Sequence, residues 1–171
     1  MIRMLALGGI LSACAWTAQE TVENPEYKAW ASFKPGSYVT LNDVQDSTSI
    51  ALGTETTLSL LDLNADRALL EVKTRTSFDA DIEDLPPRER EIPAFVPRGQ
   101  LKTPSKDGIE EISVRGRKFL CHWVEEENEK GRIRTWNTVG VPGGVVRRMI
   151  TLEGPGRTVT VQEATLWKSA P

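Results

Sequence analysis

Apolar and polar residues alternate with a period of two through most of the chain from Ser37 onward. This alternation predicts β-strands with one apolar and one polar face. Glycine-containing turn sequences separate the later segments and favour tight antiparallel connections. The strands are predicted over residues 37–44, 48–62, 67–78, 109–115, 117–126, 131–139, 145–153 and 157–168. We therefore expect a mainly β fold: a curved antiparallel meander of about eight strands that forms an open half-barrel.

The alternation also predicts which side chains share a face of a strand. Within 117–126, one face carries Phe119, Cys121 and Trp123. The opposite face carries Lys118, Leu120, His122 and Val124. Several strands thus combine a largely apolar face with a charged one. We expect the apolar face of a curved sheet to pack on a helix, on the proline-rich segment or on a ligand.

One short helix is predicted before the strands. Asn24 is a favourable N-cap, and Pro25 suits the first helical position. Tyr27 and Trp30 lie one turn apart on the same side of this helix, which runs to about residue 33 before Pro35 and Gly36 stop it.

Residues 79–108 interrupt the strand pattern. The segment holds five prolines, at positions 86, 87, 93, 97 and 104. Proline cannot donate a hydrogen bond to a sheet, so we expect either an irregular crossing or an excursion along a sheet edge. Connections of this length in a compact domain often act as lids.

The first fourteen residues have a different composition. Arg3 is followed by apolar or small residues over 4–13, about half of the roughly 20 residues that a membrane-spanning helix needs. A charged start, a short apolar run and small residues before a cleavage point are typical of an export signal. The alternative is that Cys14 is an ordinary buried cysteine.

The sequence Leu11-Ser12-Ala13-Cys14 resembles the lipobox of bacterial lipoproteins. The resemblance implies a signal peptide over 1–13, a lipid-anchored tether over 14–23 and a single antiparallel β domain over 24–171. Cys14 would carry the lipid and hold the protein on a membrane. Ala15, in place of an aspartate, favours the outer membrane, with the protein facing the periplasm.

Two further motifs resemble uncharacterised exported bacterial proteins. They are the strand Gly116-Arg117-Lys118-Phe119-Leu120-Cys121 and, after Trp136, the hairpin Val141-Pro142-Gly143-Gly144-Val145-Val146. The sheet pattern is similar to the half-barrels of Lol-type lipoprotein carriers and related lipid-binding lipoproteins. This likeness is one of architecture, and a fold alone does not determine function.

The charge balance of the chain indicates which partners it can attract. The 171 residues include 21 Lys and Arg against 24 Asp and Glu, for a formal net charge of −3. Such a chain has no general attraction for nucleic acid, and we expect no nucleic-acid partner. If Cys14 is lipidated, Cys121 is the only remaining thiol and no intramolecular disulfide can form.

No pattern in the sequence predicts a catalytic residue, a metal site or a cofactor. His122 is the only histidine and follows Cys121, but neighbouring residues on a strand point to opposite faces and cannot form a nucleophile–base pair. Asp79, Asp81 and Asp84 lack the glycine and the distant glutamate of a calcium loop. We expect a protein that is not an enzyme.

Charged residues gather on the later strands. The acids from Glu125 to Glu129 read as a solvated hairpin tip. Arginines 132, 134, 147, 148 and 157 suggest either a basic stripe or a plain solvated sheet face.

Aromatic residues are the candidates for a ligand groove. They are Trp30, Phe33, Trp123, Trp136 and Trp167. Such side chains either line a groove or fill the core. The leading hypothesis is a non-enzymatic, lipid-anchored periplasmic protein that binds an acyl chain or another hydrophobic ligand in the half-barrel. The alternative is an accessory or scaffolding subunit of a cell-envelope complex.

Overall fold

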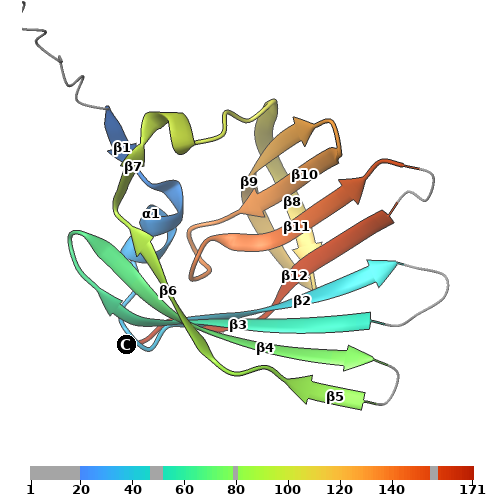
Figure 1. Ribbon diagram of the computed structural model, residues 1–171, viewed down its shortest axis with the longest axis horizontal. Helices are drawn as coiled ribbons and strands as arrows, with labels where there is room; N and C mark the ends of the chain where they lie inside the picture. Colours follow the sequence, from blue (N-terminus) through green and yellow to red (C-terminus); the bar gives the residue numbers. More distant parts are fainter. Residues whose placement is uncertain (1–19, 47–51, 79–80, 155–157) are drawn as a thin grey trace, which may run out of the picture.

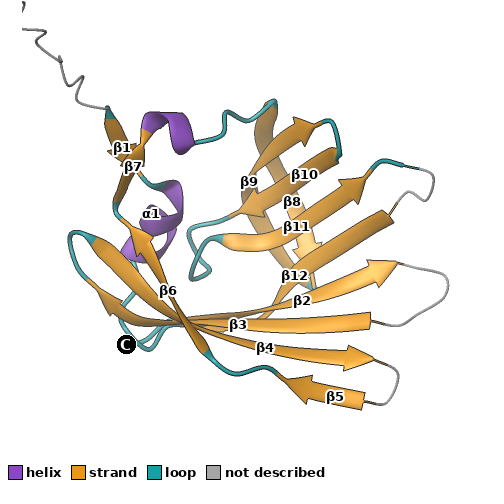
Figure 2. Cartoon of the chain, in the orientation of Figure 1, coloured by secondary structure: helices purple, strands orange, loops and turns teal. Residues whose placement is uncertain are grey.

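The computed structural model describes residues 20–46, 52–78, 81–154 and 158–171 (Figure 1). Cys14 and the proposed signal peptide lie outside these residues. The described chain is mainly β, with one short α-helix and a many-stranded antiparallel sheet that does not close into a barrel (Figure 2). The predicted fold class is confirmed.

Each of the eight predicted strands is present with similar bounds. They are β2 (Tyr38–Asp46), β3 (Leu52–Leu63), β4 (Arg67–Phe78), β8 (Lys106–Val114), β9 (Arg117–Asn128), β10 (Gly131–Asn137), β11 (Val145–Leu152) and β12 (Thr158–Lys168). The remaining elements are β1 (Thr21–Glu23), α1 (Pro25–Ala31), β5 (Asp81–Asp84), β6 (Arg88–Pro93), β7 (Phe95–Pro97) and the 3₁₀ turn η1 (Arg98–Gln100).

The order of strands departs from a simple meander at one place. Neighbours in sequence pair within β2–β3–β4 and within β8–β9–β10–β11–β12, as predicted, but the two groups are joined by β2 and β12. Figure 1 shows these two strands, cyan and red, side by side near the middle of the sheet. Gln162 of β12 donates a 2.6 Å hydrogen bond to Asp43 of β2, across 119 residues of sequence.

The proline-rich segment is an edge excursion rather than an irregular crossing. β5 and β6 pair with the two halves of β4, and Pro86-Pro87 lies in the break between them. The backbone N–H of Leu85 donates to the carbonyl of Thr74 at this break, at 2.9 Å. Prolines and charged side chains on an edge discourage further strand pairing. The chain then forms β7, which pairs with β1 at the end of the segment expected to be a tether.

Local sequence explains the helix. The Asn24 side chain accepts a hydrogen bond from the backbone of Glu26 at 3.0 Å, as an N-cap does, and Pro25 begins α1. The helix ends at Ala31, two residues earlier than predicted. Trp30 is 1% exposed. A Cβ on Gly143, whose φ is +73°, would lie 2.8 Å from its ring, so glycine permits this close packing.

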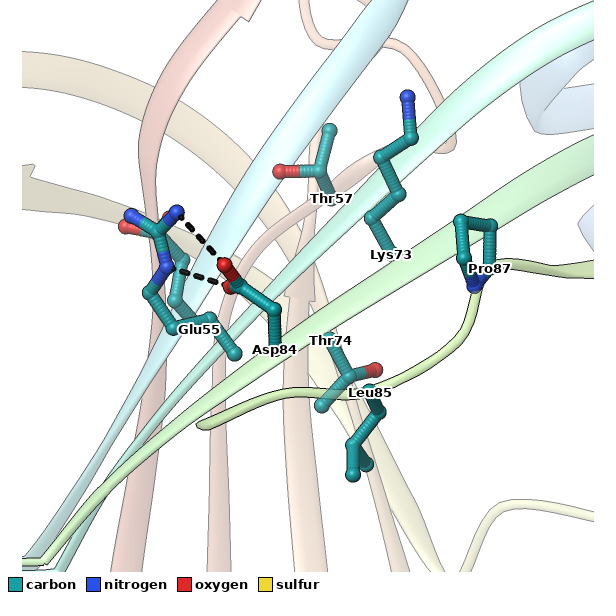
Figure 3. Close-up of a pocket in the computed structure, with 8 residues that line it drawn as sticks. Glu55, Thr57, Lys73, Thr74, Asp84, Leu85 and Pro87 are labelled. Carbon is teal, nitrogen blue, oxygen red and sulfur yellow. Dashed lines mark hydrogen bonds and ion pairs between the residues drawn. The ribbon is translucent and has the colours of Figure 1, made fainter. Parts of the chain in front are cut away.

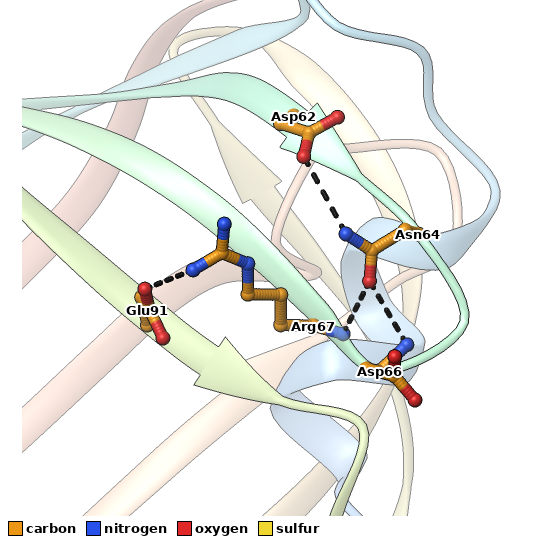
Figure 4. A network of polar contacts seen from close by, with 5 residues as sticks. All are labelled: Asp62, Asn64, Asp66, Arg67 and Glu91. Carbon is orange, nitrogen blue, oxygen red and sulfur yellow. Dashed lines mark hydrogen bonds and ion pairs between the residues drawn. The ribbon is translucent and has the colours of Figure 1, made fainter.

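An asparagine organises the turn between β3 and β4 (Figure 4). The side-chain oxygen of Asn64 accepts 3.0 Å hydrogen bonds from the backbone N–H groups of Asp66 and Arg67. Arg67 also pairs with Glu91 of β6. Tyr27 of α1 donates to the Asn64 carbonyl at 2.7 Å, which ties the helix to this turn.

The sheet buries opposite faces in its two halves. Direct cross-strand partners share a face, and one row of partners can be followed through the whole sheet: Gly108, Trp123, Trp136, Arg147, Glu163, Asn42, Glu55, Arg75 and Asp84. In β9 the face of this row also carries the buried Cys121. In β4 the buried residues, Leu70 and Val72, lie on the other face. The face of the sheet that is buried in β9 is therefore the less buried face in β4, and the reverse holds for the other face.

Each half covers its buried face differently. In the N-terminal half, β2–β6, α1 lies against β4 and β6. The C-terminal half, β8–β12, curls over its own buried face, which we call the inner face. Arg147 of β11 donates to the backbone carbonyl of Ser113 in β8 at 3.0 Å, although two strands separate them in the sheet. A bulge at Thr165 then places Trp167 opposite Val39, with its ring 5.5 Å from that of Phe119.

Candidate functional site

The five predicted aromatic candidates do not converge on one site. Trp30 and Trp136 are 1% and 6% exposed and belong to the core, whereas Phe33, Trp123 and Trp167 are half-buried against it. Trp123 and Trp136 are direct cross-strand partners in the C-terminal half. Trp30 and Phe33 belong to α1 and the residues that follow it. Of the five candidates, the structure thus brings together Trp123 and Trp136, whereas Trp167 packs against Phe119.

Two arginines accompany these tryptophans on the inner face. The guanidinium carbon of Arg134 lies 4.4 Å from the centre of the Trp123 ring, and that of Arg147 lies 6.0 Å from Trp136. Arg147 also pairs with Glu163 at 2.6 Å. Trp136 donates its indole N–H to Glu110 at 2.9 Å. Cation–π contacts and charge-assisted hydrogen bonds together fix the positions of these side chains.

Glu125 is buried, although the sequence predicted that it would be exposed to solvent. It belongs to a run of acids expected at a solvated hairpin tip, but it is 1% exposed. Arg134 contacts it through Nε at 2.8 Å and Nη2 at 2.6 Å, and Lys106 lies 3.5 Å away. The hydrogen bond from Arg134 holds the pKa of Glu125 below its ordinary value, against the opposing effect of burial. Glu125 lies two residues after Trp123 and four after Cys121 on the same strand, so alternation alone would have placed its side chain on the buried face.

The arginines do not form one basic stripe. Arg134 and Arg147 lie on the inner face and each contacts a carboxylate. Arg148, the next residue along β11, points to the opposite face, paired across the strand with Thr135. Arg157 lies outside the described residues. The expected stripe is therefore divided between two faces. On the inner face Arg134 and Arg147 are neutralised, whereas Arg132 forms no ion pair with the described residues and its buried Nε has no hydrogen-bond partner among them.

Cys121 and His122 are separated, as the alternation predicted. Cys121 is buried on the inner face, and burial raises the pKa of its thiol. His122 is exposed on the other face, where its ring lies 3.2 Å from Asp107. A buried thiol with a raised pKa is a poor nucleophile.

A depression of about 300 Å³, to which mostly polar residues contribute, lies where β5 breaks away from β4 (Figure 3). Arg75 and Asp84 form one side of it, with contacts of 2.7 and 3.4 Å, and Leu85 and Pro87 belong to the break itself. The hydrogen bond from Arg75 lowers the pKa of Asp84. Both side chains are exposed, so solvent screens the pair and it contributes little to stability.

A second pocket, of about 220 Å³, lies at the other end of the C-terminal half from Glu125. The β8–β9 hairpin provides Val114, Arg115 and Arg117, and the end of β12 provides Thr165, Leu166 and Trp167. Arg117 stacks over the Trp167 ring at 4.9 Å. The fully buried Cys121 lies between Arg117 and Trp123 on the inner face of β9, so this pocket is separate from the Trp123–Arg134 cluster.

Two kinds of feature are absent from the described residues. No group of three or more histidine, cysteine, aspartate or glutamate side chains there is arranged to hold a metal ion. No helix among them is both long and apolar enough to cross a membrane. Comparison of the sequence with protein-family models and with curated proteins gives no match.

Proposed function

We propose that this protein is a non-enzymatic, lipid-anchored protein of the bacterial cell envelope, held by acylated Cys14 on the outer membrane, that binds a hydrophobic ligand. The lipobox-like sequence at 11–14 supports the anchor and the location. The ligand would bind on the inner face of the C-terminal half, around Trp123.

The observation that carries the binding proposal is a half-buried apolar strip on this inner face. Met149 pairs across the sheet with Val161, and its partner on the other side is Arg134, which stacks on Trp123. Trp123, Met149 and Val161 are each partly accessible although they lie on the face that the C-terminal half otherwise buries. An acyl chain would remove this remaining apolar surface from water.

The polar groups beside the strip are suited to surround a ligand rather than react with it. The carboxylate of Glu125 and the guanidinium of Arg134 are satisfied by one another at 2.6 Å. Such a pair retains its own partners when an apolar molecule lies beside it, so no buried charge is left unpaired.

The test is to identify lipids that co-purify with the full chain by mass spectrometry. Trp123→Ala should reduce the bound lipid several-fold, because the indole is the largest side chain of the strip. Leu120→Ala is the matched control: it lies on the same strand, is 69% exposed on the opposite face and should not change the amount bound. Equal lipid content in all three proteins, or none in any, would rule the proposal out.

A second candidate function, docking on an envelope protein complex, is favoured by one feature of the outer face. Ile109 of β8 and Leu120 of β9 are 74% and 69% exposed. Ile109 pairs with His122, two residues along β9 from Leu120, so the two side chains are diagonal neighbours on the same face. The double substitution Ile109→Ser and Leu120→Ser should abolish recovery of a stoichiometric partner from detergent-solubilised membranes. Trp123→Ala should leave that recovery unchanged, which separates the two functions.

A further inference from the structure

We propose that the pocket between the β8–β9 hairpin and the end of β12 binds the oxyanion of a phosphate ester. This goes beyond the proposed function, because the pocket is separated from the apolar strip by the buried Cys121. Two arginines from one hairpin and a tryptophan from β12 form it.

The two arginines have no competing carboxylate. Arg67, Arg75, Arg90, Arg98, Arg134 and Arg147 each form an ion pair with an Asp or Glu side chain. Among the described residues, neither Arg115 nor Arg117 has such a partner within 4.0 Å. Their positive charge is therefore available to an external anion.

Arg117 is already oriented for this role. Its guanidinium stacks 4.9 Å from the centre of the Trp167 ring. Stacking engages the flat face of the group and leaves the N–H edge free, and that edge matches the two oxygens of a phosphate. Because the ring restricts the side chain before binding, less conformational entropy is lost when the anion arrives.

The position of Arg115 is conformationally unfavourable. Its φ is +48°, and it precedes Gly116 with φ +75°, so the pair forms the tight turn of the hairpin. Asparagine or glycine suits the first of these positions better than a residue with a long side chain. In the described chain Arg115 is the only non-glycine residue with positive φ. Arginine does not favour the backbone conformation of this turn, but it places a second positive charge next to the proposed anion site.

The remaining lining determines the size and character of the ligand. About 220 Å³ is room for a phosphate group and a short substituent, but it is below the usual size of a site that encloses a whole drug-sized molecule. The hydroxyl of Thr165 already donates within the sheet, at 3.3 Å from the carbonyl of Thr40. Val114 and the half-exposed Leu166 give the pocket an apolar side, which suits an ester with an apolar substituent.

Isothermal titration of the full chain in a neutral detergent tests this site with two probes, inorganic phosphate and dihexanoyl phosphatidic acid. The wild type should bind at least one of them, and added salt should weaken the binding. Arg117→Gln should reduce the affinity about tenfold, as the loss of a charge-assisted hydrogen bond predicts. Arg117→Lys should also weaken binding although it keeps the charge, because lysine lacks the planar fork. Tighter binding of the lipid identifies a lipid headgroup as the ester. Equal or tighter binding of inorganic phosphate would overturn the assignment of an ester and leave a site for free phosphate.

The matched control is Arg88→Gln on β6, which removes the same charge from an exposed arginine that has no ion pair within the described residues. It should leave the affinity unchanged. Binding lost equally in Arg88→Gln and Arg117→Gln would mean non-specific attraction and would overturn the proposal. So would binding retained in the Arg115→Gln, Arg117→Gln double variant, or no binding of either probe to the wild type.

Discussion

Arg134 on β10 lies directly opposite Glu125 on β9, and its guanidinium contacts the carboxylate at 2.6 and 2.8 Å. Glu125 is almost fully buried, and its contacts with Arg134 are the main interactions that offset the cost of removing its carboxylate from water. The same guanidinium stacks on Trp123. One side chain therefore links the buried charge of the C-terminal half to the surface where we propose a ligand binds.

Arg134→Met should destabilise the protein by about 3 kcal/mol, the usual cost of leaving a buried charge without its partner. Arg75→Met is the control, because Arg75 forms a similar two-contact pair with Asp84 in which both side chains are exposed. That substitution should cost much less, because solvent screens the exposed pair. Urea denaturation measures both, and equal losses would contradict the role assigned to burial.

Acid should weaken the fold through Glu125. Its pKa is lowered in the folded state, so its stabilising contribution is complete above the ordinary value of 4.5 and is lost as the pH falls through the lower, folded-state value. The free energy of unfolding should therefore decline below about pH 4.5. Glu125→Gln should show a shallower decline in denaturation curves recorded from pH 7 to pH 3. Superimposable pH profiles would show that another group controls acid stability.

Thr151→Val should leave the protein equally stable or stabilise it by about 1 kcal/mol. Thr151 is 1% exposed, and its hydroxyl oxygen has no hydrogen-bond partner among the described residues, so valine removes a buried polar group without losing a bond seen there. Thr40→Val is the matched control, because the hydroxyl of Thr40, also buried, lies 2.9 Å from that of Thr57. The control should lose about 1 kcal/mol in thermal or urea unfolding. A comparable loss in Thr151→Val would reveal an ordered water at that hydroxyl.

Gly108→Ala should destabilise the protein by about 1–3 kcal/mol, the usual cost of overpacking. A Cβ at this position would lie 2.9 Å from the indole nitrogen of Trp123, which would have to shift and disturb its contact with Arg134. Gly99→Ala is a suitable control because nothing lies within 4 Å of its Cβ position. A fall in melting temperature together with a shifted tryptophan emission is expected for Gly108→Ala alone.

Cys14→Ser should release the protein from membranes if the lipobox proposal is correct, because the lipid is attached to the thiol of that cysteine. Cys121→Ser keeps the anchor and should remain in the membrane fraction. Fractionation of cells expressing each variant provides the measurement. Continued membrane association of Cys14→Ser would refute lipidation as the anchor.

Alternation along the chain predicted the eight long strands, because a half-buried strand has a simple periodic signature. It assigned the faces less well, since the bulge at Thr165 moves Trp167 to the face opposite Val161. It could not identify the partner of β12. Pairing of Val39 with Trp167 joins strands that are far apart in sequence, and two apolar strand faces carry no information about which remote strand they meet.

The candidate site was predicted only in part. Trp123 and Trp136 were found as aromatic residues, but the sequence did not assign Arg134 and Glu125 to each other. The acids that follow Glu125 along the hairpin hid its inward position, because a run of like charges usually indicates solvent exposure. Whether each tryptophan lines a groove or fills the core depends on how deeply its indole ring is buried. That burial depends on which face of the sheet is covered at that strand, and this changes across the sheet.

The place of β12 in the middle of the sheet has a consequence for how the chain folds. Until residues 158–168 are available, β2 and β11 each have an unpaired edge, and the two strand groups cannot become one sheet. Joining them requires closure of a very long loop, which slows folding and leaves open edges exposed to other chains. A protein truncated before Thr158 would therefore consist of two incomplete sheets prone to aggregation, and the final strand is the one that commits the whole chain to its native state.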